Sequence, residues 1–468
     1  MKDIYDYNSE KSNSTTYDTK VIQTDVGAEN GQEKCPKCGA TEITLNINTG
    51  KLVCNFCRYQ FEPEKVEELE EDLSDLEGEI IASGAKDIQE DFESVVTLKC
   101  TSCGAEVIIN TSEVTQARCH WCRNTLSINQ QIPNGSIPDV VLPFKISKEI
   151  AEKEIQGFVG KRKFFAHPKF KAEFKTDNIL GIYLPYMIVD VNGHANFRGR
   201  GEHLLKSYYV GTDKNKEKYY DAEVYEVERE FDIIIDGLSI ESSSDKLDNK
   251  SSDNTNNIIN SIMPFDVENC VKWDSNYLKG YNSEKRDINI GDISSRVELQ
   301  IKDIARFSAN KSLVYYDRGV AWSYQNLDID GQRWKSAYLP VWLYSYQQVS
   351  GNKKLLHYVA VNARTKETMG SIPVNYIKLT LVSAIIEFIS LIVMFFVDHE
   401  YEWLLLSLGI IFFLAMYFRY RNTDARHSHE TETKTKVSNL RRSDKYIGTR
   451  RRLKNDTMNG ANNKVVNG

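Results

Sequence analysis

The sequence predicts a multidomain α+β protein, and three features of the chain support this fold class. Eight of the nine cysteines form two matched sets near the N-terminus. A central region rich in β-branched and aromatic residues follows, and two strongly apolar runs lie near the C-terminus. At 468 residues the chain is long enough for about two to four folded units. Its formal net charge of -7 argues against a protein that coats nucleic acid.

The cysteines repeat one pattern, in which a CxxC pair is followed after fifteen residues by a second CxxC pair. The first set is Cys35, Cys38, Cys54 and Cys57, and the second set is Cys100, Cys103, Cys119 and Cys122. Four thiolates at this spacing close a tetrahedral site around Zn²⁺ and leave no open coordination position, which is typical of a structural site. The sequence therefore predicts two zinc ribbons with two structural Zn²⁺ ions. An iron–sulfur cluster or a rubredoxin-like iron is the alternative for the same ligands.

The residues around the cysteines repeat as well. A glycine follows the first pair of each set, at Gly39 and Gly104, where the chain must reverse and a positive φ is favoured. Phe56 and Trp121 lie inside the second pairs, and we expect them to pack against the ribbon sheets rather than to stack on bases. The ninth cysteine, Cys270, has no histidine or acid in a catalytic frame around it, so we expect a buried, inert thiol.

The segment between the ribbons is strongly acidic. Residues 62–93 carry fourteen Asp or Glu side chains against Lys65 and Lys86, which is a local net charge of -12. An amphipathic helix is predicted by the 3-4-3-4 spacing of Val66, Leu69, Leu73, Leu76 and Ile80. A solvated helix that packs one stripe on a neighbour is favoured over a dedicated partner surface. In both cases the segment would repel a phosphate backbone.

The central region is the largest predicted domain, and we expect it to be β-rich. A helix is predicted over 147–162, strands over 181–240, and a second helix near 293–309 before a closing β-meander. The polar stretch 242–260 is predicted to be a disordered insert. A duplicated half-domain is a hypothesis suggested by two recurring phrases, LPF at 142–144 with YLPY at 183–186 and MPF at 263–265 with YLPV at 338–341. The prolines favour strand starts, edges or bulges.

Two apolar runs, residues 379–397 and 403–418, are separated only by the short acidic sequence DHEYE. Since a helix needs about 20 apolar residues to cross the hydrocarbon core, the first run fits and the second is slightly short. We interpret them as a transmembrane helical hairpin, with two buried helices of a soluble domain as the alternative. Glu387 lies near the middle of the first span, where a charge costs about 3 kcal/mol. Close approach of the helices is favoured by the small residues Ser383, Ala384, Gly409 and Ala415.

Charge predicts the orientation of the hairpin. From Arg419 to Gly468, thirteen Lys or Arg side chains stand against five Asp or Glu, giving +8. The positive-inside rule then places both termini in the cytoplasm, as in a multi-pass protein of the inner (cytoplasmic) membrane. The first 30 residues contain no apolar stretch, so we expect no secretory signal peptide. Free thiolates fit the same reducing compartment.

Together these motifs resemble a bacterial family of TFIIB-type zinc-ribbon membrane proteins whose function is uncharacterised. The resemblance rests on the paired CxxC motifs, VVLPFKISKE from residue 140, GIYLPYMIVDV from residue 181 and YLPVWLYSY from residue 338. It covers most of residues 95–397 and implies zinc binding and membrane residence, but no established activity. Some relatives carry a primosomal-helicase label, yet this sequence has no GxxxxGK[ST] nucleotide motif.

These features favour a binding protein over an enzyme. The sequence contains no HExxH, GxSxG or glycine-rich nucleotide loop, so we expect no catalysis and no small-molecule substrate. We expect a membrane-anchored scaffold or adaptor that contacts the lipid bilayer and binds a protein partner at the cytoplasmic face. Membrane-tethered nucleic-acid binding is the alternative. The net charges of +3 over residues 34–61 and +1 over residues 99–126 give only weak support to nucleic-acid binding.

The predicted domain order is therefore a disordered lead-in (1–30), zinc ribbon 1 (31–61), the acidic helix (62–93), zinc ribbon 2 (94–130), the central β-rich α+β domain (140–376), the two-helix transmembrane hairpin (379–420) and a basic disordered tail (421–468).

Overall fold

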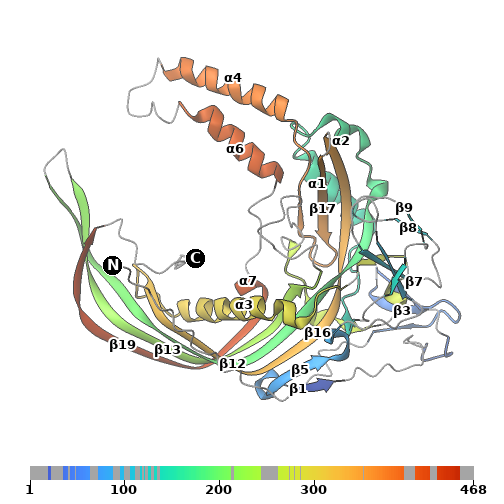
Figure 1. The fold of residues 1–468 in the computed structure, drawn as a ribbon, viewed down its shortest axis with the longest axis horizontal. Helices are drawn as coiled ribbons and strands as arrows, with labels where there is room; N and C mark the ends of the chain where they lie inside the picture. Colours follow the sequence, from blue (N-terminus) through green and yellow to red (C-terminus); the bar gives the residue numbers. More distant parts are fainter. Residues whose placement is uncertain are drawn as a thin grey trace, which may run out of the picture.

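A curved antiparallel sheet of long strands forms a half-barrel at the centre of the protein (Figure 1). Its strands are, in spatial order, β19 (Lys434–Leu453), β13 (Glu217–Glu241), β12 (Leu180–Val210) and β16 (Val320–Ser350). The computed structural model describes residues 19–22, 35–40, 43–47, 49–63, 72–87, 95–99, 106–110, 116–118, 121, 125–127, 131–133, 138–211, 216–243, 262–273, 275–278, 280–284, 286–350, 353–394, 406–421 and 429–453. The chain is thus mixed α+β with a β-rich centre, as the sequence predicts.

The pair formed by β12 and β16 runs through the middle of this sheet. It extends from Leu180 opposite Leu343 to Gly201 opposite Val320. The register shifts at Gly193 and at Gly199, where a side chain would collide with backbone carbonyl groups of β16. Because a bulge bends a strand and increases its twist, these two glycines help to curve the sheet.

Two prolines lie inside these central strands, although their sequence context favours strand starts, edges or bulges. The Pro185 carbonyl accepts a hydrogen bond from the N–H of Ser242, and the Pro340 carbonyl accepts one from the N–H of Ala363. The N–H and C=O positions of an antiparallel strand residue point toward the same neighbour. The position where each proline lacks an N–H therefore points away from the β12–β16 ladder. It points instead toward the end of the next strand.

The other edge of β16 is covered by short strands. β5 (Gly78–Ala82) and β11 (Val140–Val141) pair with it in parallel, and β17 (Lys353–Asn362) pairs antiparallel. β18 (Thr368–Gly370) pairs with the outer edge of β17, and β1 (Thr19–Ile22) pairs with the outer edge of β5.

The strand β5 corrects the amphipathic helix predicted over residues 62–93. A 3-10 turn at Leu73–Asp75 precedes the strand, and residues 64–71 and 88–94 lie outside the described residues. The edge of β16 offers hydrogen bonds that a local helix pattern does not reveal. Gly331 also allows the Leu76 carbonyl to approach the sheet more closely than any side chain would permit.

The helix α3 (Ile290–Asn310) crosses the concave face of the half-barrel, close to the helix predicted at 293–309 (Figure 1). Its buried residues are Ile293, Val297, Ile301, Ile304, Ala305 and Ala309. They form one helical face and join Phe197, Phe231 and Trp334 of the sheet in a single hydrophobic cluster. The N–H of Asn289 donates to the Asp292 carboxylate and satisfies one donor at the start of the helix.

The remaining elements surround this core. The helices α1 (Lys148–Gly160) and α2 (Pro168–Glu173) cover the end of the sheet near β17, and α1 matches the helix predicted at 147–162. A smaller sheet region continues from β12 through β15 (Asn282–Glu284), β7 (Glu106–Asn110), β6 (Val95–Lys99) and β10 (Gln131–Pro133). β14 (Val271–Lys272) pairs with β11. β8 (Gln116–Arg118) pairs with β9 (Thr125–Ser127). Most of the predicted insert, residues 244–260, lies outside the described residues.

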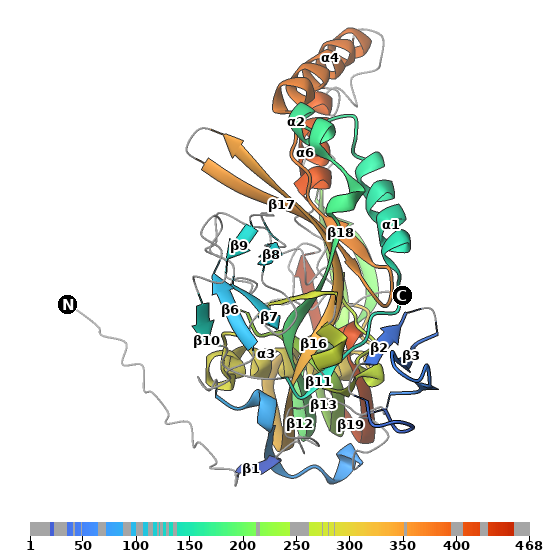
Figure 2. The same ribbon diagram turned by 90° about the vertical axis from the view of Figure 1, so that its right-hand side faces the viewer.

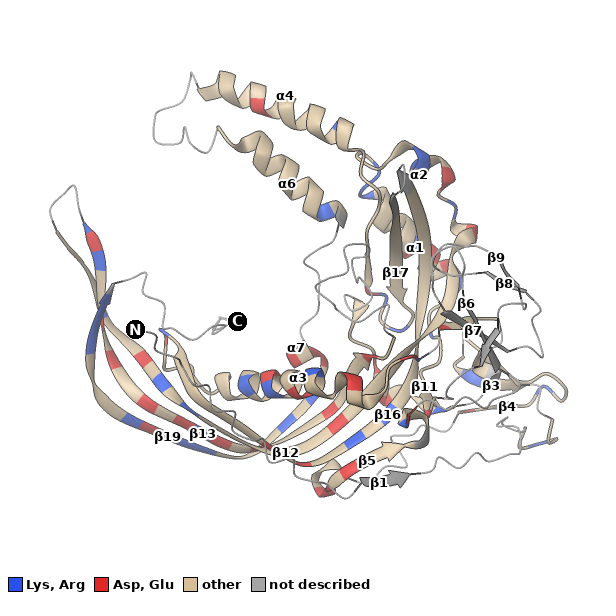
Figure 3. Ribbon diagram, in the orientation of Figure 1, with Lys and Arg blue, Asp and Glu red and all other residues tan. Residues whose placement is uncertain are grey.

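The strand β19 corrects part of the prediction of a disordered basic tail over residues 421–468, whereas residues 422–428 and 454–468 lie outside the described residues. β19 has eight Lys or Arg and one acid, while its partner β13 has nine Asp or Glu and two bases (Figure 3). Ion pairs join Arg441 to Glu230 at 3.6 Å and Arg451 to Asp221 at 3.9 Å. Charge complementarity between the two strands therefore holds this part of the tail in the sheet.

The one acid of β19, Asp444, meets a buried base. It accepts two hydrogen bonds, at 2.7 and 3.3 Å, from the guanidinium of Arg229, whose side chain is 2% exposed. Nearby, Asn439 donates to Asp232, and that carboxylate in turn raises the pKa of His194 on β12. Side-chain contacts thus link β19 directly to β13 and, through Asp232, to His194 of β12.

Replacement of Asp444 by alanine leaves the Arg229 guanidinium without its carboxylate partner. We expect the free energy of unfolding to fall by about 2 kcal/mol, below the usual cost of breaking a fully buried pair because the Asp444 side chain is 38% exposed. Urea denaturation of the full chain in detergent measures this change. The exposed Asp330 of β16 serves as control, and an Asp444→Ala chain as stable as Asp330→Ala would contradict the role of this pair.

A helical hairpin projects from the α1–α2 end of the sheet (Figures 1 and 2). α4 (Tyr376–Met394) is long and apolar enough to cross a membrane, whereas α6 (Leu408–Arg421) is shorter. α6 begins later than the predicted apolar run at 403, and residues 395–405 lie outside the described residues. The N–H of Ile372 donates to the Tyr420 carbonyl at 3.3 Å, so the two ends of the hairpin meet.

The contact between the two helices is polar and close. The buried positions of α4 include Ser383 and Ser390, and Glu387 lies between them on the same face. The Glu387 carboxylate accepts a hydrogen bond of 2.7 Å from the N–H of Gly409 in the first turn of α6. An acidic group at a helix N-terminus is favourable, so this contact gives Glu387 a structural role. Ala384 and Ala415, also predicted to aid packing, are exposed.

Substitution of Gly409 by valine should separate the helices, because a Cβ there would lie 2.5 Å from the Ser383 carbonyl oxygen. Cysteines placed at Tyr376 and Tyr417, whose rings are 6.3 Å apart, report on the separation through disulfide crosslinking. We expect the crosslink yield to drop several-fold in Gly409→Val and to persist in the exposed control Ala415→Val. Equal yields in both chains would show that α4 and α6 do not pack through Gly409.

Candidate metal centre

The first set of cysteines is gathered in a small three-stranded sheet. Its strands are β2 (Ile43–Asn46), β3 (Lys51–Cys54) and β4 (Gln60–Phe61). Each CxxC pair forms a tight turn that ends on a residue with positive φ, Gly39 at 72° and Arg58 at 60°. The N–H of Gly39 donates to the Cys35 carbonyl and that of Arg58 donates to the Cys54 carbonyl. The prediction for Gly39 is confirmed, while Gly104 lies outside the described residues.

The four sulfur atoms converge on one point. The Sγ atoms of Cys35, Cys38, Cys54 and Cys57 all lie within 4.8 Å of one another. The Cys35–Cys57 and Cys38–Cys54 separations are both 3.6 Å. A tetrahedron with metal–sulfur bonds of about 2.3 Å has edges of about 3.8 Å, so these separations fit four thiolates around one ion. They are too long for disulfides, and all four cysteines are free.

The thiols of this cluster influence one another's ionisation. The N–H of Cys57 lowers the pKa of the Cys54 thiol to about 7. A backbone hydrogen bond from Ala40 lowers the pKa of Cys38, but desolvation and the three other cysteines outweigh it and raise that pKa to about 12. Four adjacent sulfurs cannot all ionise without a compensating cation. The donor set therefore fits a metal ion, which would allow all four thiolates to form together.

The small sheet that carries this cluster is docked on the central domain. Ile43 and Leu52 are buried in the same hydrophobic cluster as Phe144 and Tyr277. The opposite side faces solvent, where Phe56 is 81% exposed. This exposure contradicts the expectation that Phe56 packs against the ribbon sheet.

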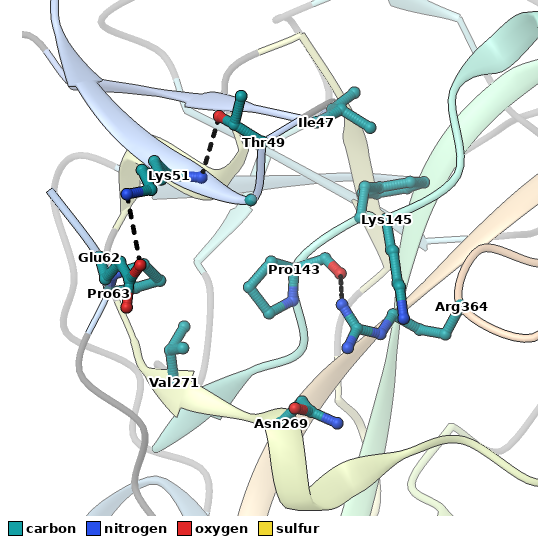
Figure 4. A pocket seen from close by; sticks show the side chains of 12 residues that line it. Ile47, Thr49, Lys51, Glu62, Pro63, Pro143, Lys145, Asn269, Val271 and Arg364 are labelled. Atoms are coloured by element: carbon teal, nitrogen blue, oxygen red, sulfur yellow. Dashed lines mark hydrogen bonds and ion pairs between the residues drawn. The ribbon is translucent and has the colours of Figure 1, made fainter. Parts of the chain in front are cut away.

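A cavity of about 470 Å³ lies along the seam between the ribbon and the central domain (Figure 4). Lys51 on the ribbon side pairs with Glu62 at 3.4 Å. Arg364 on the other side donates to the Pro143 carbonyl and forms an ion pair with Asp266 at 2.7 Å. Lys51 and Arg364 thus already have partners within the fold, and Lys145 is a third cation that lines the cavity. The cavity lies at the interface between this small sheet and the central domain.

The second set of cysteines, Cys100, Cys103, Cys119 and Cys122, lies outside the described residues. Trp121 between the last two is described, and it is buried against the central domain. Its ring meets Tyr358 of β17 edge-on at 5.2 Å. β7 from the same region pairs with β15, so this region also docks on the central domain. Cys270 is buried as expected, and burial raises the pKa of its thiol to about 12.

Comparison with known proteins adds no relative to this picture. No family model matches the chain, and neither the curated proteins nor the solved structures contain a similar one. The resemblance to TFIIB-type zinc-ribbon membrane proteins therefore stays a prediction.

Replacement of Cys54 and Cys57 by serine should remove one bound metal ion per chain, because two of the four ligands of the cluster are lost. Metal analysis of the purified full chain measures the stoichiometry. Cys270→Ser is the matched control, since this buried thiol lies outside the cluster, and it should leave the metal content unchanged. Unaltered metal content in the double variant would refute the ligand assignment.

Proposed function

We propose that the protein is a membrane-anchored scaffold or adaptor whose cytoplasmic zinc ribbons bind protein partners. The observation that supports this proposal is the orientation of ribbon 1, which docks through its sheet and exposes Phe56 between its second pair of cysteines. Phe56 at the tip of that pair is 81% exposed, and Tyr59 beside it is also exposed. Exposed aromatic side chains on a rigid support are typical anchors of protein interfaces.

Membrane anchorage is supported by the inverted polarity of the hairpin. The buried residues of α4 are Leu379, Ser383 and Ser390, whereas Ile377, Leu381, Ile385 and Phe388 are exposed. Such an apolar outer surface is unfavourable in water and fits the hydrocarbon core of a bilayer. The 14 residues of α6 span about 21 Å, less than the roughly 30 Å core. A complete second crossing therefore needs residues from 395–405.

The proposed orientation places both ends of the hairpin in the cytoplasm. The contact between Ile372 and Tyr420 keeps the two ends together on the side of the β-rich domain. Many of the tail cations that suggested this orientation are matched by β13, but Lys378 and Arg419 remain at the hairpin ends. A cytoplasmic location also keeps the cysteines reduced, as Zn²⁺ ligands require. We propose one structural Zn²⁺ in each ribbon, two in all.

Nucleic-acid binding is the second candidate. Lys37 lies 5.8 Å from the centre of the Tyr59 ring, and Arg58 is exposed between Phe56 and Tyr59. Exposed aromatics beside cations are also the features that stack on single-stranded nucleic acid. The net charge of +3 over residues 34–61 would give such binding a weak electrostatic component.

A photo-crosslinking residue at position 56 of the full chain in membranes separates the two candidates. We expect protease-sensitive adducts that disappear when Cys54 and Cys57 are replaced by serine, because the exposed tip then loses its support. Val314, which is 89% exposed on the central domain, is the matched control position. Adducts that are instead sensitive to nuclease would contradict the scaffold proposal and favour the second candidate.

A further inference from the structure

A cluster of cations without acidic partners lies at the base of the helical hairpin. Residues 161–175, which connect α1 to β12, carry six Lys or Arg against Glu173, for a net charge of +5. This charge differs from the charge on β19, where the cations face an acidic strand. Figure 3 shows Lys and Arg on α2 and at the adjoining ends of α4 and α6.

Two ammonium groups of this cluster converge on Phe164. The Lys378 Nζ donates to the Phe164 carbonyl at 3.1 Å and lies 3.6 Å from the centre of the Phe164 ring. The Lys171 Nζ reaches the same carbonyl at 3.5 Å. Desolvation, followed by the charges of Lys378 and Lys163, lowers the pKa of Lys171. Among the described residues, no carboxylate forms an ion pair with Lys163, Lys171 or Lys378.

A second part of the cluster is fixed rigidly to the hairpin. The Arg162 Nε donates to the Arg419 carbonyl at 3.1 Å, and the Arg162 guanidinium lies 3.5 Å from the centre of the Phe158 ring. The buried Tyr420 hydroxyl donates to the Arg162 carbonyl and accepts from the N–H of Phe165 at 3.0 Å. These bonds fix the position of the cations along the axes of α4 and α6, at the base of the hairpin.

The apolar surface of the hairpin ends at this same position along the helices. Phe164 is 60% exposed, and Tyr376 at the first residue of α4 is 48% exposed. Aromatic side chains with adjacent lysines and arginines are typical of a membrane–water interface. The cations there would face the phosphate groups of the lipids that surround the hairpin.

We infer that the segment 161–175, together with Lys378, binds the phosphate of an anionic phospholipid headgroup at the cytoplasmic surface of the membrane. The inference rests on the membrane insertion proposed above. Lys171 and Lys378 supply two converging ammonium donors, and the exposed Phe164 ring lies beside the acyl chains. Because the site is continuous with the apolar faces of α4 and α6, we assign a lipid and not a soluble phosphate.

Full-length protein reconstituted into vesicles tests this inference. One set of vesicles contains phosphatidylcholine alone, and the other contains phosphatidylcholine mixed with phosphatidylglycerol. Flotation and alkaline extraction report insertion, while a fluorescent phosphatidylglycerol probe reports the preference for anionic lipid. We expect preferential association, weakened by about fivefold for each lysine removed in Lys171→Gln and Lys378→Gln, with insertion unchanged.

The matched control replaces Lys153 and Lys272, two exposed lysines outside the cluster, and should retain the preference. Normal insertion without any lipid preference, or a preference that survives loss of Lys171 and Lys378, would overturn the lipid site and leave the membrane anchor intact. Displacement of the probe by inorganic phosphate would overturn the lipid assignment in favour of a soluble anion. Failure to insert would overturn the membrane anchor, and the lipid site with it.

Discussion

Pairing between β12 and β16 is the interaction on which the rest of the structure depends. Leu184 lies opposite Leu339 in this ladder, and the YLP phrases of the two strands therefore pair with each other in opposite directions. Because side chains alternate across a strand, the leucines enter one hydrophobic cluster and the tyrosines Tyr183 and Tyr338 enter another. The small sheet with the cysteine cluster, the helices α1 and α2 and the helical hairpin all pack on the cluster that contains these tyrosines.

Charge is distributed according to what each surface must contact. The basic strand β19 is matched by the acidic strand β13, so its cations act within the fold. The cations of residues 161–175 have almost no acids nearby in the sequence and lie beside an exposed apolar hairpin. Two basic segments of the sequence thus differ in their surroundings, because, within the part of the chain that the structure describes, only β19 has an acidic partner strand.

Local patterns in the sequence were sufficient for several elements. The CxxC spacing identified the cluster of Cys35, Cys38, Cys54 and Cys57, and helical periodicity located α1 and α3. Predictions failed where a distant segment decides the structure. The apolar spacing of residues 66–80 resembles a helix, but β5 forms because the edge of β16 lies some 250 residues away in the chain. β19 likewise needs the acidic strand β13, more than 200 residues earlier. The local sequence does not predict the exposure of Phe56, because that exposure depends on which side of the small sheet docks on the central domain.

The position of β19 after the hairpin has a consequence for biosynthesis. The ribosome completes β12, β13 and β16 before it makes α4 and α6, and it makes the last long strand of the half-barrel only afterwards. The acidic edge of β13 thus stays uncovered while the apolar helices emerge. β19 can pair with this edge only after both helices have been made. In the order of the chain, completion of the β-rich domain therefore follows synthesis of the helical hairpin.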